Sequence, residues 1–312
     1  MTSGPRVALA TASTAWDQDE DAPLLVPALE DLGAHAVPAV WDDPTVDWSS
    51  FDVVVVRSTW DYTSRLDEFL DWSDRVEQVT RLENPARVLR WNTDKRYLGE
   101  LAATGLAVVP TTFLLAGDQD SLRRAADTFA TTGHGGDVVI KPTVSAGSKD
   151  TARHAPDQRE AAADHARSLL AAGRDVMVQP YLAGVDEHGE TGMVFLRGEL
   201  SHGFRKGPLL LGGPADVDGL FAREQIDPRV PTEAEVALGA AVVAACAART
   251  GASELLYARI DVLPGPDGAP ILLEAELTEP SLFLEQSAGA AERAARAILA
   301  AARREERDGP AV

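Results

Sequence analysis

The chain has 312 residues, of which 45% are hydrophobic and 25% charged, a composition typical of a folded protein with two or three subdomains. Its formal net charge of −20 argues against binding to nucleic acid or to an anionic membrane surface, because either partner would repel it. The longest apolar run, Ala240–Ala248, is about half of the ~20 residues that a membrane span requires.

The N-terminal apolar run and the cysteine content bear on the cellular compartment. The run Val7–Ala12 has the length of a strand and is too short for the apolar region of a signal peptide. The one cysteine, Cys246, lies inside an apolar helical run and cannot form an internal disulfide. We therefore expect a cytoplasmic protein without nucleic-acid or membrane partners. A homodimer is one expectation for an oligomeric state that the sequence leaves open.

The N-terminal third alternates between strands and helices. Three strands are expected, at Arg6–Ala12, Ala36–Val40 and Asp52–Val56. The third is apolar throughout, as is typical of a buried parallel strand, and a helix-length stretch at Leu24–Leu32 separates the first two. This alternation predicts a doubly wound α/β domain at residues 1–92. Ligands bind beyond the carboxyl ends of such strands, so Arg57–Tyr62 is a candidate binding loop.

Two further units follow. Thr93–Ala103 is expected to be a helix within a connecting segment at residues 93–110. Residues 111–183 predict an α+β lid, with helices at Ser121–Thr131 and Gln158–Ala172. Residues 184–306 predict a C-terminal subdomain, and residues 307–312 a frayed tail. The elements expected in the C-terminal subdomain are strands at Gly192–Arg197, Leu255–Leu263 and Pro270–Glu276, an alanine-rich helix after Thr232 and a last helix from about Ala288.

Lysine is rare in this chain. Only four of the 29 basic residues are lysines, and they are Lys95, Lys141, Lys149 and Lys206. Genomic base composition can produce such an arginine bias without any function. An ammonium group is nevertheless a compact point charge that suits phosphate, so each lysine retained in this lysine-poor chain is a candidate for a site that requires it.

The first chemical motif is an apolar strand that delivers Lys141 at its end. The loop that follows holds the small residues Ser145, Ala146, Gly147 and Ser148. Small side chains let backbone N–H groups approach phosphate oxygens, so the loop is a candidate phosphate cover. The Walker pattern GxxxxGK[ST] is absent, and a strand followed by a flexible hairpin would give the same pattern.

The second motif, Val178–Leu182, is a strand that ends at a proline. Gln179, Tyr181 and Leu182 lie where backbone groups become available to read an adenine edge, and Asp186 follows within reach of ribose hydroxyls. An ordinary exit from a strand into a loop is the alternative.

The third motif pairs two strands that carry charge on one face. Strand periodicity places Arg259 with Asp261, and Glu274 with Glu276, and the loop Pro264–Ala269 suggests that the strands form a hairpin. Buried carboxylates need cations among them, and Mg²⁺ suits such an oxygen site. A solvated sheet face with salt bridges is the alternative. Lys206, beyond a separate hairpin, could reach phosphates.

Taken in this order, the motifs resemble those of the ATP-grasp superfamily over roughly residues 85–300. The resemblance implies an ATP-grasp fold of mixed α/β and α+β type, in which an N-terminal α/β domain precedes two subdomains that grip ATP. It also implies the cofactors ATP and Mg²⁺. Glu276 departs from the asparagine that many members carry. By position, the resemblance implies that Lys206 and Arg259 are the catalytic cations. It implies that Asp261, Glu274 and Glu276 are the metal ligands. The implied ATP contacts are Lys95, Lys141, Ser145–Ser148, Gln179, Tyr181, Leu182 and Asp186.

A narrower similarity is to the branch of O-ureido-serine cyclo-ligases that contains D-cycloserine synthetase. The loop Val144–Gly147 and the pair Asp61-Tyr62 depart from that branch. The similarity rests on Asp43–Trp48, Arg57-Ser58 with Trp60, Arg90-Trp91 with Asp94-Lys95, Gln179–Tyr181, Gly189–Thr191 and Glu279–Leu282.

The resulting hypothesis is an ADP-forming ligase that activates a carboxylate as an acyl phosphate and joins it to a nitrogen nucleophile, within one molecule or between two. An intermolecular amino-acid or peptide ligase, a small-molecule phosphotransferase and a non-catalytic nucleotide-binding subunit are the alternatives. The expected partner is a small, amino-acid-like substrate. Its candidate contacts are Arg57, Ser58, Trp60, Arg65, Glu190 and Ser281.

Overall fold

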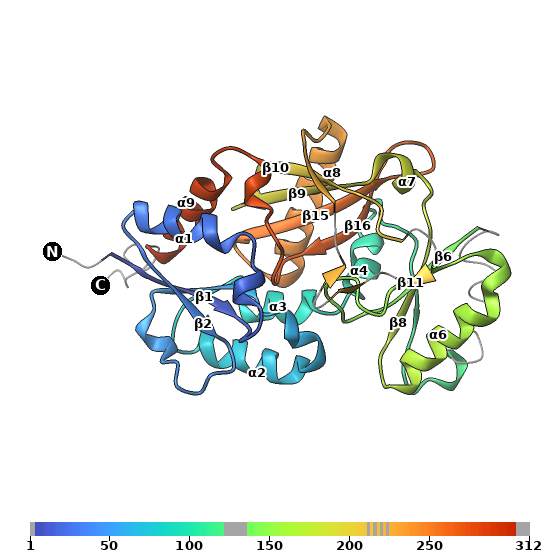
Figure 1. Ribbon diagram of the computed structural model, residues 1–312, viewed down its shortest axis with the longest axis horizontal. Coiled ribbons are helices and arrows are strands. Elements are labelled where there is room, and N and C mark those ends of the chain that lie inside the picture. Colours follow the sequence, from blue (N-terminus) through green and yellow to red (C-terminus); the bar gives the residue numbers. More distant parts are fainter. Residues whose placement is uncertain are drawn as a thin grey trace.

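A computed structural model describes residues 4–121, 136–210, 213–214, 217–218, 221–222 and 225–303. The helix expected at Ser121–Thr131, apart from its first residue, and the tail at residues 307–312 lie outside the described residues. Three units are visible in Figure 1: an N-terminal unit in blue, a lid in green, and a C-terminal sheet in yellow to red. The predicted combination of α/β and α+β architecture is confirmed.

The N-terminal sheet is parallel throughout, with strand order β2-β1-β3-β4. The alternate valines of its third strand, β3, pack into two separate hydrophobic cores. Val53 and Val55 pack toward α1 and α9, whereas Val54 and Val56 pack toward α2. β3 is therefore buried along its whole length, as its apolar sequence predicts. The elements of this unit are β1 (Arg6–Thr11), η1 (Trp16–Gln18), α1 (Ala22–Asp31), β2 (His35–Val40), η2 (Trp48–Ser50), β3 (Val53–Ser58), η3 (Trp60–Ser64), α2 (Leu66–Glu77) and β4 (Leu82–Glu83), with α9 (Ala290–Ala302) added from the end of the chain.

The lid is an antiparallel sheet of order β11-β7-β6-β8-β5 with one described helix, α6, packed on it (Figure 1). Ala162, Ala166 and Leu169 of α6 meet Ile140 and Val178 of the two central strands in one apolar core. The elements are β5 (Thr112–Leu114), β6 (Val138–Pro142), β7 (Ala152–His154), η4 (Pro156–Gln158), α6 (Arg159–Ala171), β8 (Val176–Pro180) and β11 (Gly213–Pro214).

The C-terminal sheet is antiparallel, with strand order β14-β10-β9-β15-β16. Its long helix α8 begins at a capping box formed by Thr232 and Glu235 and ends before Gly251, whose φ of 66° favours glycine. Neither α8 nor any other helix among the described residues is long and apolar enough to cross a membrane. The elements are α7 (Gly184–His188), β9 (Glu190–Leu196), β10 (Glu199–Lys206), β12 (Val217–Asp218), β13 (Phe221–Ala222), β14 (Ile226–Arg229), α8 (Glu233–Thr250), β15 (Tyr257–Pro264), β16 (Pro270–Glu276) and η5 (Leu284–Gln286).

The connecting segment differs from its prediction. The helix expected at Thr93–Ala103 begins four residues later, as α4 (Tyr97–Ala103), and α3 (Ala86–Asn92), which was not predicted, precedes it with a break between the two. At the break the Lys95 backbone N–H donates to the Thr143 carbonyl at 2.9 Å, so a tertiary hydrogen bond replaces a helical one. This hydrogen bond places Lys95 beside the loop that follows β6.

Asn84 ties the N-terminal unit to the C-terminal sheet. Its side-chain amide donates to the carbonyls of Tyr257 and Leu277 at 2.9 and 2.8 Å, and its carbonyl oxygen accepts from the Leu256 N–H at 2.8 Å. The side chain is completely buried, so solvent cannot replace these partners.

Replacing Asn84 with alanine is therefore expected to lower the free energy of unfolding by about 3 kcal/mol, because buried backbone groups lose their partners. Urea denaturation of Asn84→Ala measures the change. The control is Gln78→Ala at an exposed helix end, and a loss at Asn84 no larger than in this control would contradict the assignment.

Candidate active site

The site is built on the antiparallel pair β15 and β16. The register places Arg259 opposite Glu276 and Asp261 opposite Glu274. Alternate residues of a strand share a face, so the hairpin brings three carboxylates and one guanidinium onto one side of the sheet. The hairpin and this juxtaposition were both predicted.

Lys206, from β10, and Arg259 lie among these carboxylates. The Lys206 Nζ is 3.2 Å from Asp261 Oδ2 and 3.3 Å from Glu190 Oε2. The Arg259 guanidinium donates to Asp261 at 3.0 Å and also to Glu276. Both cations are buried, so their charges are poorly screened by water.

Lys95 and Lys141 both contact Glu274. Their Nζ atoms lie 3.2 and 3.7 Å from the Glu274 carboxylate oxygens, and Lys95 also donates to the Ser145 carbonyl at 2.6 Å. Three of the chain's four lysines thus converge on this carboxylate cluster. The fourth, Lys149, is exposed.

The pKa values of the two glutamates in the cluster, Glu274 and Glu276, are shifted in opposite directions. Burial alone would raise the pKa of Glu274, but the charges of Lys95, Lys141 and Lys206 lower it well below its usual range. Burial raises the pKa of Glu276, and the negative charges of Glu274 and Asp261 add to that rise against the effect of Arg259. Glu276 is therefore harder to ionise than Glu274.

A cavity of about 810 Å³ opens beside the cluster and is lined by all three units. This volume is within the usual range for small-molecule sites. Of the residues proposed from sequence, those that line it are Trp60, Lys95, Lys141, Ser145, Ala146, Gly147, Ser148, Gln179, Tyr181, Leu182, Glu190, Lys206, Arg259, Glu274, Glu276 and Ser281.

Five proposed residues lie outside the lining. Asp261 is held behind Lys206 and Arg259. Asp186 is exposed, accepts from the Tyr181 hydroxyl and pairs with Arg153 at 3.6 Å. The remaining three are Arg57, Ser58 and Arg65.

Arg57 and Ser58 are buried inside the N-terminal unit, whereas Arg65 lies at its surface. Arg57 is 3% exposed, pairs with Asp21 at 2.9 Å and donates to the Pro280 carbonyl at 3.1 Å. Ser58 shares a hydrogen bond with Thr11 at 2.8 Å. Arg65 is partly exposed and is engaged by surface carboxylates, including Glu68 at 2.6 Å. The end of β3 therefore contributes to packing, and Trp60 beyond it reaches the cavity.

Several lining residues were not proposed from sequence. Tyr62 and Glu279 lie inside motifs that were noticed, the segment after β3 and the Glu279–Leu282 run, so a signal was present. No sequence signal marked Asn92 and Phe283, because each reaches the cavity only through tertiary packing. The acidic run Asp17–Asp21 also lines the cavity although it was taken for a polar loop.

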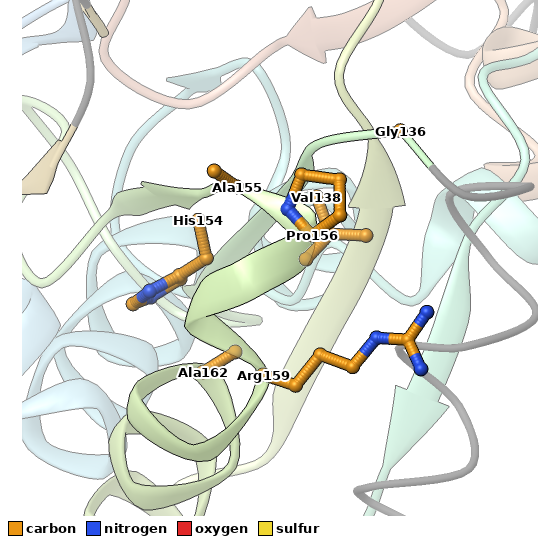
Figure 2. A pocket seen from close by; sticks show the side chains of 7 residues that line it. All are labelled: Gly136, Val138, His154, Ala155, Pro156, Arg159 and Ala162. Atoms are coloured by element: carbon orange, nitrogen blue, oxygen red, sulfur yellow. The ribbon is translucent and has the colours of Figure 1, made fainter.

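A second cavity, of about 10 Å³, lies in the lid (Figure 2). It is about the size of one water molecule. In Figure 2, His154 and Arg159 point in opposite directions, so they do not converge on a common ligand.

The three units and the charged cleft between them define an ATP-grasp ligase. The structure of the ATP-grasp ligase PsnB complexed with a minimal precursor superposes with a TM-score of 0.62 at 17% identity, covering 96% of this chain and 99% of that one. That likeness is one of fold.

Closer relatives narrow the class. A family model described as the N-terminal domain of D-cycloserine synthetase DcsG matches residues 7–84. The cycloserine biosynthesis protein DcsG of Streptomyces lavendulae is 41% identical over 294 residues, 94% of this chain and 97% of the relative. The crystal structure of D-cycloserine synthetase DcsG superposes with a TM-score of 0.89 at 39% identity, covering 96% of this chain and 100% of that one. The chain belongs to the D-cycloserine synthetase DcsG family and is an ATP-dependent ligase.

The placement of Arg57 yields a test of its structural role. Arg57→Met leaves the carboxylates of Asp19 and Asp21 buried without their cation, so we expect the free energy of unfolding to fall by about 3–5 kcal/mol. Arg65→Met, which breaks exposed pairs, should cost less than about 1 kcal/mol. Urea denaturation compares the two variants. Equal, small losses would show that Arg57 is not a structural cation.

Proposed function

We propose that this chain transfers the γ-phosphoryl group of ATP to a substrate carboxylate and joins the resulting acyl group to a nitrogen nucleophile. In the first half-reaction a carboxylate oxygen attacks the γ-phosphorus, and ADP leaves with the electron pair of the broken P–O bond. In the second, the nitrogen forms a bond to the acyl carbon and phosphate leaves. The convergence of three lysines and Arg259 on the carboxylates of β15 and β16 is the observation that carries this proposal.

The cations have separate tasks in this proposal. Lys95 and Lys141, next to the small-residue loop after β6, bind the nucleotide phosphates, and Gln179 and Leu182 line the adenine end of the cavity. Lys206 and Arg259 stabilise the charge that develops on the transferring phosphoryl group, because fixed positive charge is most effective in a buried site. Closure of the lid would exclude water from the acyl phosphate.

Mg²⁺ fits the carboxylates that face the cavity. Glu274 and Glu276 supply hard oxygen donors, and a divalent cation beside Glu276 would favour its ionised form against the burial that raises its pKa. No group of three His, Cys, Asp or Glu side chains within the described part of the chain has metal-binding geometry. The three-residue ligand set expected from sequence, Asp261 with Glu274 and Glu276, is therefore reduced in this proposal to the two glutamates that line the cavity, since Mg²⁺ is commonly held by one or two carboxylates together with phosphate oxygens and water. The ion would supply neutralising charge at the phosphates.

We further propose that the nucleophile belongs to the activated molecule itself, so that a ring closes. Membership in the D-cycloserine synthetase DcsG family supports this, and O-ureido-serine is the corresponding probe. Ligation between two amino acids is the second candidate. It is favoured by the residues that depart from the cyclo-ligase pattern, because Tyr62 and Ser145–Gly147 line the cavity.

The reaction class is tested with ATP, Mg²⁺ and a panel that contains both enantiomers of O-ureido-serine and pairs of amino acids. A ligase releases ADP and phosphate with an amide or ring product, whereas a phosphotransferase releases ADP and retains the phosphate on its product. We expect ADP and phosphate in equal amounts. A stable phosphorylated product would contradict the ligase assignment.

Glu274→Gln should lower the rate of ADP release by at least about 100-fold, because the variant removes the charge that orders Lys95 and Lys141 and one proposed metal ligand. Substrate-dependent ADP release measures the effect. Glu292→Gln on the surface of α9 serves as control. Retained activity in Glu274→Gln would remove this carboxylate from the site.

A further inference from the structure

Glu279 lines the same cavity from the segment that follows β16, beside Trp60 and Tyr62 of the N-terminal unit. The Tyr62 hydroxyl donates a hydrogen bond to the Glu279 carboxylate. The Trp60 indole N–H donates to the Glu279 backbone carbonyl at 3.4 Å. Tyr62 is itself fixed, because it is buried and stacks on Phe69 with ring centroids 5.0 Å apart. The carboxylate is thus held in place by an aromatic wall.

Glu279 differs in its charge partners from the other glutamates of the cavity that are not exposed; Glu20, which also lines the cavity, is exposed. Glu190, Glu274 and Glu276 each contact a lysine or arginine, whereas no ion pair among the described residues includes Glu279. Burial raises the pKa of Glu279 to about 7, and Glu274 acts in the same direction. The Tyr62 hydrogen bond and the charges of Lys95 and Arg259 act against this rise. The group therefore exchanges a proton near neutral pH.

The second half-reaction requires a proton acceptor. A nitrogen that attacks an acyl phosphate gains positive charge as the C–N bond forms, and it must lose a proton to give a stable amide. Lys206 and Arg259 cannot accept this proton. Glu274 and Glu276 are committed to cations. His202 is buried, its Nε2–H donates to the Leu282 carbonyl at 2.8 Å, and it lies outside the residues that line the cavity.

We propose that Glu279 is the general base that takes this proton, and that Tyr62 is the residue that positions it. The inference rests on the proposed ligase function and specifies its second step. The nitrogen lone pair forms the C–N bond, the C–O bond to phosphate breaks, and phosphate leaves with that electron pair. The N–H proton passes to the Glu279 carboxylate, which later releases it to water.

Glu279→Gln separates the two half-reactions, since the amide keeps the shape of the side chain and cannot accept a proton. Hydroxylamine is a small and strongly nucleophilic amine that is uncharged at neutral pH, so it converts acyl phosphates to hydroxamates without an enzyme base, and water takes the proton that its nitrogen loses. With the substrate that the unmodified enzyme turns over, we expect hydroxylamine-dependent ADP release by the variant to stay within about threefold of the normal rate of ADP release. The C–N product should form at least about 100-fold more slowly.

The outcomes distinguish the base role from the proposed function. Absence of ADP release from the unmodified enzyme across the whole panel would overturn the ligase function itself. Normal formation of the C–N product by Glu279→Gln would overturn only the base role. Loss of both hydroxamate and product, with ATP binding and the thermal midpoint unchanged, would also overturn the base role, because Glu279 would then act in substrate binding or phosphoryl transfer.

The pH profile provides a readout that a structural role would not change. A base must be ionised, so the rate of product formation should fall as the pH drops through about 7. Glu279→Asp should retain this acid limb at a lower rate, and Glu279→Gln should lack it. Tyr62→Phe, which removes the positioning hydroxyl, should change the pH at which the rate of product formation falls. Glu285→Gln, an exposed neighbour, is the matched control and should leave the profile unchanged.

Discussion

The register of one antiparallel hairpin determines the site. By placing Asp261 opposite Glu274 and Arg259 opposite Glu276, the pairing of β15 with β16 gathers one buried and two partly buried carboxylates whose repulsion must be offset by cations. Lys206 arrives from β10 in the same sheet, while Lys95 and Lys141 come from the connecting segment and the lid. A slip of one residue would turn these side chains to the opposite face and dissolve the cluster.

The three units contribute unequally to the chemistry. The connecting segment, the lid and the C-terminal sheet supply the charged groups that suit phosphates. The N-terminal unit supplies aromatic side chains, Trp60 and Tyr62, which hold Glu279 at the edge of the cavity. Helix α9, from the end of the chain, completes the core of that N-terminal unit and so ties its position to the C-terminal sheet (Figure 1).

Patterns that act over short distances were readable in the sequence. Strand periodicity and the turn residues between Asp261 and Glu274 were sufficient to predict the hairpin and its charged face, and the scarcity of lysine pointed to Lys95, Lys141 and Lys206. Arg57 shows the limit of such reasoning. It stands at the carboxyl end of a parallel strand, but its partner Asp21 lies on a loop whose position follows only from tertiary packing. The break between α3 and α4 was missed for the same reason, since a hydrogen bond to Thr143 causes it.

The central claim is that the cations and carboxylates of this cavity hold one metal–nucleotide complex. A crystal structure with Mg²⁺ and a non-hydrolysable ATP analogue tests it most directly. The account predicts phosphate oxygens in contact with Lys95, Lys141 and Lys206, and a metal ion on the carboxylates of Glu274 and Glu276. A nucleotide bound elsewhere, or phosphates that none of these lysines touches, would contradict it.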